Sequence, residues 1–128
     1  MTQTFGIDVV EVERIRSAGQ DATGLLAEFF TAREISECRS RRHPHASLAA
    51  CLAVKEALLK AAGIGLNEGL LFRDIEVFRQ DSGIDRLQLR GRMKEIIGNE
   101  SDNPCLVSSA YTDDLACAVV ALQHKGTE

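Results

Sequence analysis

The chain has 128 residues, of which 45% are hydrophobic and 27% charged, and its formal net charge is −4. This length suits a single domain, residues 1–128, and the apolar content excludes a disordered chain. The net negative charge argues against bulk nucleic-acid binding. No apolar run reaches membrane-spanning length, and no basic segment precedes one near the N-terminus, so we expect neither export nor membrane insertion.

The four cysteines are scattered along the chain. They form no CxxC pair, and no histidine lies at zinc-ligand spacing from them. We expect reduced, mostly buried thiols in a cytoplasmic protein.

The N-terminal segment is apolar and β-branched, but carboxylates interrupt it. We expect a strand over residues 6–10 that passes into a helix over residues 11–18. Asp8 lies inside this strand, where an unpaired carboxylate is costly. Two explanations remain open: hydrogen bonding to nearby backbone at a strand end, or binding of a cation.

A loop over residues 19–24 and a short helix over residues 25–30 are expected next. Thr31 then begins another helix as its N-cap, because Glu34 follows three residues later and completes a capping box.

A basic loop, SRRHPH, occupies residues 40–45 and is broken by Pro44. Its charge is either solvated or contacts an anionic ligand, in which case Arg42 is a candidate contact.

The next stretch, SLAACLAVKEALLKAAGIG, predicts a central helix that Ser47 caps and Gly63 ends. A helix that is apolar nearly all round is buried, so its charged residues Lys55, Glu56 and Lys60 need a reason. Glu56 and Lys60 are four residues apart and share one face. They form either an ordinary helical ion pair or a carboxylate and an ammonium directed into a polar cleft, where they could hold a metal and a phosphate.

The second half of the chain predicts antiparallel strands. We expect strands over residues 70–78 and 84–90 around a turn at 81–83, a short helix over 92–97, two strands over 105–122 joined across 112–114, and a frayed tail from 123. The fold class is therefore α+β, an antiparallel sheet with a long central helix packed on it.

Two carboxylates in apolar settings, Asp8 and Glu56, are the best candidates for chemistry. No glycine-rich phosphate loop precedes a helix, and no GxSxG motif occurs. A few carboxylates together with substrate phosphate oxygens are a common way to hold Mg²⁺. A diphosphate on that ion would meet Lys60 as a point charge.

Four blocks stand in order along the chain: GIDVVEVERI (residues 6–15), FFTAREI (29–35), LAACLAVKEALLKAAGIG (48–65) and FRDIEV (72–77). Together they resemble the motifs of the holo-acyl-carrier-protein synthase family, the small type of 4′-phosphopantetheinyl transferase. The resemblance runs from about residue 5 to residue 122, and its third block is the most specific.

The resemblance implies a 4′-phosphopantetheinyl transferase-like fold and transfer of the phosphopantetheine arm from coenzyme A to a serine of an acyl carrier protein, for fatty acid or polyketide synthesis. It implies that Asp8 and Glu56 ligate Mg²⁺ and that Lys60 contacts the coenzyme phosphates and assists the leaving group. The base that takes the serine proton is either Glu56 or a metal-bound water. Arg14 would meet the acidic carrier, and Glu76 would be structural. The family is typically a homotrimer with active sites between subunits.

Three positions depart from the family pattern, and we expect all three to lie on the substrate side of the site. Cys51 stands where an arginine is usual, Gly83 is not followed by the usual Lys-Pro, and Tyr111 replaces a histidine near the coenzyme. Tyr111 can still stack on the coenzyme or hydrogen-bond to it. The alternative function is therefore a catalytically impaired homologue that only binds coenzyme A or a carrier protein.

Overall fold

A five-stranded antiparallel sheet with strand order β1-β5-β4-β3-β2 organises the fold. The computed structural model describes residues 2–19, 24–65, 71–79, 85–98 and 105–124. The strands are β1 (Thr2–Glu11), β2 (Ile75–Arg79), β3 (Asp85–Leu89), β4 (Cys105–Tyr111) and β5 (Leu115–His124). The helices are α1 (Val12–Gly19), α2 (Leu26–Phe29), α3 (Ala32–Arg39), α4 (Pro44–Ala62) and α5 (Gly91–Ile97), with a 3₁₀ turn η1 (Phe72–Asp74).

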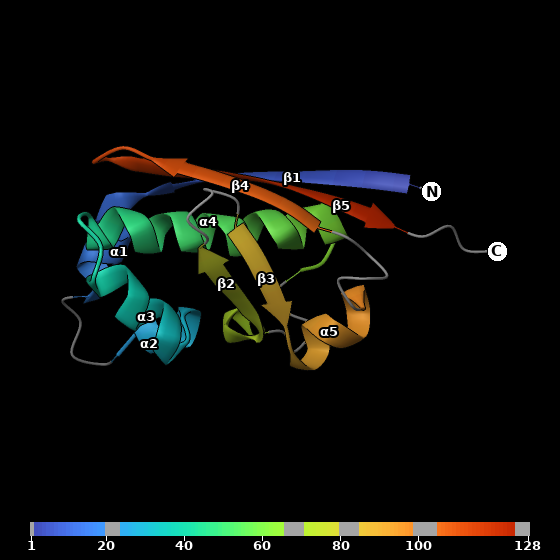
Figure 1. The fold of residues 1–128 in the computed structure, drawn as a ribbon, viewed down its shortest axis with the longest axis horizontal. Helices are drawn as coiled ribbons and strands as arrows, with labels where there is room; N and C mark the ends of the chain where they lie inside the picture. The colour runs from blue at the N-terminus through green and yellow to red at the C-terminus, as the bar shows by residue number, and fades with distance from the viewer. Residues whose placement is uncertain (1, 20–23, 66–70, 80–84, 99–104, 125–128) are drawn as a thin grey trace.

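Helix α4 lies at the centre of the molecule. In Figure 1, β1, β5 and β4 run along one side of α4, while β2, β3 and the shorter helices α2, α3 and α5 lie on its other side. Residues from most faces of the helix are fully buried, including Leu52, Ala53 and Leu58 at 0% exposure. The predicted α+β class and the buried central helix are both confirmed.

Strand β1 approaches α4 unusually closely at Gly6. A Cβ atom at this position would lie 1.8 Å from the carbonyl oxygen of Ala57. Burial alternates along β1, so Gly6, Asp8 and Val10 face inward. The missing side chain of Gly6 therefore lets Asp8, two residues later, reach the surface of α4.

The start of α4 differs from the prediction. The helix begins at Pro44, with His43 in the N-cap position, whereas Ser47 is fully buried in the first turn and donates to Cys38 Sγ at 3.4 Å. A proline at the first helical position needs no N–H partner and has a helical φ already fixed. Pro44, which was predicted to break the basic loop, therefore starts the helix.

Other local predictions have mixed outcomes. The Thr31 capping box is present, and Gly63 ends α4 with a positive φ of 69°. Helix α1 begins one residue later than expected, η1 replaces the start of the strand over 70–78, and β5 continues to His124 where a frayed tail was expected. Two predicted segments lie outside the described residues: the turn at 81–83 and residues 20–23 of the loop over 19–24. All four cysteines carry thiols, as expected, but only Cys38 and Cys51 are buried.

The outer face of β1, β5 and β4 is apolar. Its exposed large side chains are Phe5, Ile7, Val9, Leu106, Leu115 and Val119. The helices lie on the opposite side of these three strands in Figure 1. An extended apolar surface of this kind marks an interaction site. No helix among the described residues is long and apolar enough to cross a membrane.

Candidate active site

Asp8 on β1 and Glu56 on α4 are neighbours at the contact between strand and helix. Asp8 is only 8% exposed, and its Oδ2 atom is buried with no hydrogen-bond donor among the described residues. The side chain of Glu56 is 21% exposed. A buried carboxylate oxygen without a partner lowers the free energy of unfolding, and binding of a cation or a proton at Oδ2 would remove this cost.

Each of these carboxylates contacts one cation. Lys60 Nζ lies 2.7 Å from Asp8 Oδ1 and also donates to the Ile7 carbonyl oxygen at 3.1 Å. Arg14, on α1, has its Nη1 atom 3.2 Å from Glu56 Oε1. The structure thus brings together Asp8, Glu56, Lys60 and Arg14, four residues that the sequence had singled out. Among the described residues Lys60 pairs with Asp8 and not with Glu56, so the ordinary helical ion pair is absent.

The pKa values of the two carboxyl groups are shifted in opposite directions. Burial, a hydrogen bond with Asp8 and the charge of Asp8 together raise the pKa of Glu56 to about 7, although Arg14 opposes them. Burial also raises the pKa of Asp8, but hydrogen bonds with Glu56 and Lys60 and the charge of Lys60 outweigh it, so this pKa is lower than usual. Glu56 therefore keeps the proton up to neutral pH, while Asp8 is ionised.

The pair fits a small, hard divalent cation. Mg²⁺ is usually bound through one or two carboxylates, and its other ligands are water or substrate phosphate oxygens. Oδ2 of Asp8 and the partly exposed carboxylate of Glu56 supply oxygens of this kind. Within the described ranges no cluster of three or more His, Cys, Asp or Glu side chains could hold a metal. An ion at the pair would therefore take its remaining ligands from water or from a bound substrate.

A second lysine–carboxylate pair joins Lys55 of α4 to Glu34 of α3, and the sequence did not predict it. Lys55 Nζ lies 2.7 Å from Glu34 Oε1 and donates to the carbonyl oxygens of Phe29 at 2.7 Å and Phe72 at 3.1 Å. Glu34 Oε2 accepts the N–H of Val77 at 2.8 Å. Lys55 did signal such a pair, because it is a charged residue in an apolar helix. Its partner was not predicted, because the capping box already accounted for Glu34.

Cys51 lies in the interior and not at a ligand-facing surface. It is 3% exposed, and its Sγ atom is 3.3 Å from Glu34 Oε2. The expectation that this departure lies on the substrate side is wrong. Glu76 is structural, as expected: it is 4% exposed and accepts hydrogen bonds from Thr31 at 2.6 Å and Arg90 at 2.7 Å.

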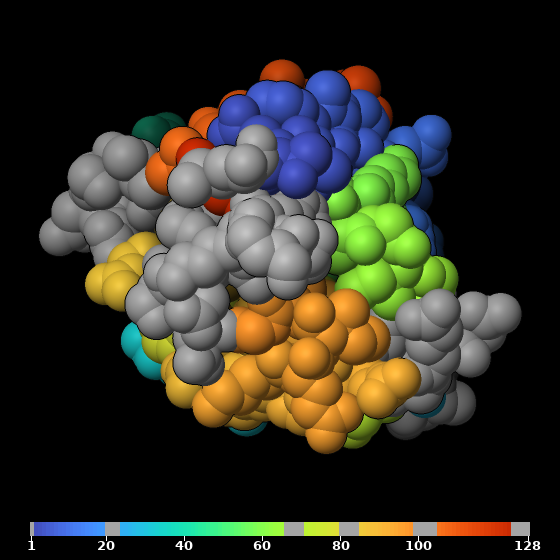
Figure 2. Space-filling model, turned by 90° about the vertical axis from the view of Figure 1, so that its right-hand side faces the viewer, coloured from blue at the N-terminus to red at the C-terminus, as the bar shows by residue number. Residues whose placement is uncertain are grey.

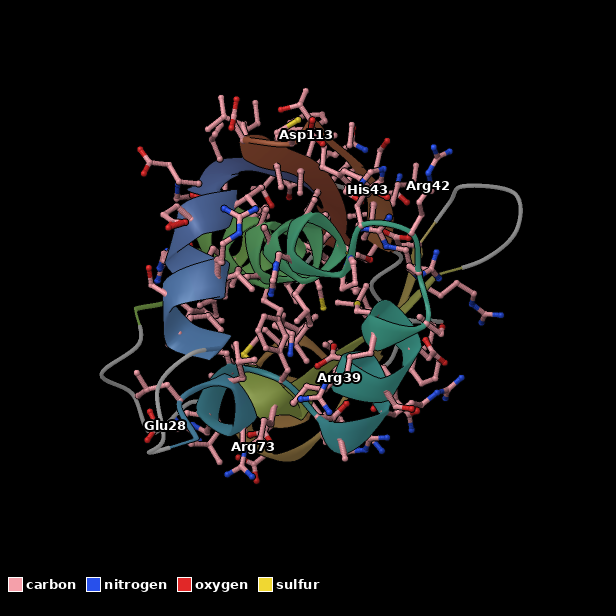
Figure 3. The ribbon with its side chains drawn as sticks, turned by 90° about the vertical axis from the view of Figure 1, so that its left-hand side faces the viewer. Glu28, Arg39, Arg42, His43, Arg73 and Asp113 are labelled. Carbon is pink, nitrogen blue, oxygen red and sulfur yellow. The ribbon has the colours of Figure 1, made fainter. Side chains whose placement is uncertain are left out.

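Arg42 and Tyr111 lie elsewhere, around the N-terminal end of α4. Arg42 contributes to a cavity of about 200 Å³ whose lining residues are Val12, Arg16, Arg42, His43, Pro44, His45, Ala46 and Asp113. Figure 3 shows Arg42, His43 and Asp113 grouped at this end of the molecule. The Tyr111 ring lies 6.3 Å from the His43 ring. The sequence contained a signal for His43. A proline is favoured at the first position of a helix, so Pro44 predicts a helix start with His43 next to it.

The two clusters are separate within one chain. Helix α4 rises about 18 Å between its start and Glu56, at about 1.5 Å per residue. Figure 2 shows the C-terminal end of α4, in green, reaching the surface beside β1, in blue. The structure therefore does not place Arg42 and Tyr111 next to the carboxylate pair.

Residues 4–120 match the 4′-phosphopantetheinyl transferase superfamily. This chain belongs to that superfamily. A holo-[acyl-carrier-protein] synthase of Moorella thermoacetica is 35% identical over 123 residues, which cover 96% of this chain and 95% of the relative. Another, from a Geobacter species, is 34% identical over 122 residues, with 93% and 96% covered. The resemblance drawn from the four sequence blocks is confirmed.

A solved member of the superfamily has the same fold. The ACPS–CoA complex of Chronobacterium ammoniagenes matches this structure with a TM-score of 0.83 and 23% sequence identity, covering 98% of this chain and 100% of that one. The predicted 4′-phosphopantetheinyl transferase-like fold is therefore confirmed.

Proposed function

We propose that this protein is a holo-acyl-carrier-protein synthase, which transfers the 4′-phosphopantetheine group of coenzyme A to a serine of an acyl carrier protein. The observation that carries the proposal is the meeting of Asp8, Glu56, Lys60 and Arg14 at the contact of β1 with α4. Two relatives named holo-[acyl-carrier-protein] synthase and a solved relative in complex with coenzyme A support it.

In this proposal Asp8 and Glu56 would hold Mg²⁺ where the coenzyme diphosphate binds. Bound there, the ion would neutralise charge on the phosphate oxygens. Lys60 is 58% exposed at its side chain, so its ammonium can turn from Asp8 to a phosphate oxygen. There it stabilises the charge that develops on the leaving adenosine 3′,5′-bisphosphate.

The carrier serine supplies the nucleophile, and its proton needs an acceptor. Glu56 is a candidate base, because burial and Asp8 raise the pKa of its carboxyl to about 7 in the absence of a metal. As the serine oxygen bonds to the β-phosphorus, the bond from that phosphorus to the bisphosphate oxygen breaks. Arg14, at the rim of the site and 53% exposed, is positioned to meet an acidic carrier surface.

Arg42 and Tyr111 are assigned to coenzyme A as well. Arg42 shares its cavity with Arg16 and His43, which makes the N-terminal end of α4 a basic surface for an anionic ligand. Tyr111 offers a ring for stacking and a neutral phenol for hydrogen bonding.

We further propose a homotrimer with active sites between subunits, in a cytoplasmic protein whose residues 1–128 form one domain. The exposed apolar face of β1, β5 and β4 supports self-association. The separation of Arg42 and Tyr111 from the carboxylate pair also supports a site that a neighbouring subunit completes.

The test is to incubate the protein with coenzyme A, Mg²⁺ and apo carrier protein and to weigh the carrier by intact mass spectrometry. We expect a gain of one phosphopantetheine. Asp8→Ala and Glu56→Ala should abolish this gain while circular dichroism stays unchanged. Glu95→Ala removes a carboxylate of α5 that is 68% exposed and pairs with Arg92, and it should retain full activity. Full activity of either site variant would contradict the metal assignment.

A second candidate is a binding module that holds coenzyme A or a carrier without transfer. The replacement of a histidine by Tyr111 favours it, whereas the buried Cys51 no longer does. Coenzyme A binding without any mass gain, on every apo carrier of the same organism, would support this candidate.

A further inference from the structure

Both carboxylates of the candidate active site already have a cationic partner. Lys60 on α4 contacts Asp8, and Arg14 on α1 contacts Glu56. A divalent cation held between Asp8 and Glu56 would meet these two positive charges at short range. The positive charges of the ion, Arg14 and Lys60 would repel one another at this distance. Binding of the ion therefore favours moving a side chain away from its carboxylate.

Arg14 is the more weakly held of the two cations. Among the described residues its one hydrogen bond is with Glu56, at 3.2 Å, whereas charge-assisted N–H···O bonds are commonly about 2.7–2.9 Å. Its side chain is 53% exposed. Lys60, in contrast, bonds to both Asp8 and the Ile7 carbonyl oxygen. Arg14 can therefore turn into solvent at little cost.

We propose that Arg14 and a divalent cation compete for Glu56, so that metal binding releases Arg14 for the acidic carrier protein. The competition follows from the contacts of Arg14, while its consequence for the carrier rests on the proposed function. Thermodynamic linkage makes the effect reciprocal: a carrier that draws Arg14 away from Glu56 tightens metal binding by the same factor. Metal and carrier then favour each other through one arginine.

The competition is tested by titrating Mg²⁺ alone into the folded protein by calorimetry. The titration is run at pH 8, above the pKa of about 7 that Glu56 has. We expect Arg14→Gln to bind Mg²⁺ more tightly than the wild type by about twofold to fivefold, the range of one partly exposed ion pair. An unchanged or weaker affinity in Arg14→Gln would overturn the proposal.

Arg92→Gln is a closely matched control. Arg92 is also 53% exposed and also lies 3.2 Å from its carboxylate partner, Glu95. Its replacement removes the same charge from the protein, and we expect the Mg²⁺ affinity to stay at the wild-type value. An equal gain in both variants would mean that net charge, and not the contact with Glu56, sets the affinity, which would also overturn the proposal.

The second half of the proposal is tested with the carrier. Mg²⁺ should tighten binding of the apo carrier to the wild type, and Arg14→Gln should lose this Mg²⁺ dependence. Dependence retained in Arg14→Gln would contradict the release of Arg14. If the wild type binds no carrier with or without Mg²⁺, the proposed function fails, while the Mg²⁺ titration still decides the competition.

Discussion

Two lysines of α4 form ion pairs of the same length in opposite surroundings. Lys55–Glu34 and Lys60–Asp8 are both 2.7 Å long. The side chains of the first pair are 0% and 1% exposed, and those of the second pair are 58% and 10% exposed. Distance alone therefore does not distinguish a structural ion pair from a candidate catalytic one.

The difference lies in how completely each pair is satisfied. Lys55 donates to three acceptors, and both oxygens of Glu34 accept hydrogen bonds. At the other pair, Oδ2 of Asp8 has no donor among the described residues, and Lys60 is free to turn outward. A saturated buried pair stabilises the fold, whereas an unsaturated exposed pair keeps bonding capacity for a ligand.

Lys55→Ala should produce the largest loss of stability. Removing one partner of a buried ion pair leaves Glu34 as an uncompensated charge, which costs about 3–5 kcal/mol. Urea denaturation measures the change in the free energy of unfolding. Lys60→Ala is the comparison, and it should unfold close to the wild-type midpoint. Equal destabilisation by the two substitutions would remove the distinction between the pairs.

Lys60→Ala should instead produce the larger loss of activity in a folded protein. Losing one group that stabilises transition-state charge lowers kcat by about 10²–10³-fold. Quantifying modified carrier over time gives the rate. Lys60→Arg keeps the charge and should recover part of it. A wild-type rate in Lys60→Ala would show that this ammonium does not act on the phosphates.

Mg²⁺ binding should depend on pH through Glu56. The group must lose its proton to bind metal, and its pKa is raised from 4.5 to about 7. Affinity should therefore fall as the pH drops below about 7 and level off above it, as calorimetry between pH 5.5 and 8.5 would measure. A flat profile across this range would contradict the raised pKa.

The same shift affects stability in the absence of Mg²⁺. A carboxyl whose pKa is higher in the folded protein than in the unfolded chain binds its proton more tightly when folded, so its contribution is greatest at low pH. This contribution is lost as the pH rises from about 4.5 to about 7. Glu56→Gln should lack this loss, and thermal unfolding of both proteins at pH 5 and pH 8 compares them.

Tyr111→His should produce the smallest effect. A histidine can add a charged hydrogen bond to an anionic coenzyme, which limits the gain to about 1–2 kcal/mol. Arg79 lies 5.9 Å from the Tyr111 ring, and its positive charge opposes a second one. Coenzyme A titrations at pH 5.5 and pH 8 should show tighter binding at the lower pH only. Equal affinity of both proteins at both values would exclude Tyr111 from the site.

The sequence predicted the features that depend on local pattern. Neighbouring residues were enough to predict the apolar helix α4 and the Thr31 capping box. They also showed that Asp8 and Glu56 are carboxylates within apolar segments. The sequence did not predict partners distant in the chain, such as Lys55 with Glu34 or Arg14 with Glu56. Spacing along a helix predicts which residues are neighbours on that helix. These two contacts depend instead on how α1 and α3 pack against α4.

Gly6 has a consequence for comparing sequences within the superfamily. A side chain at residue 6 would meet the Ala57 carbonyl oxygen, so Gly6→Ala would push β1 away from α4. Asp8 would move with the strand, while Glu56 and Lys60 would stay with the helix. A homologue could therefore retain Asp8, Glu56 and Lys60 and still lose the packing that brings them together. Residue 6 therefore belongs to the geometry of the candidate site although it carries no polar group.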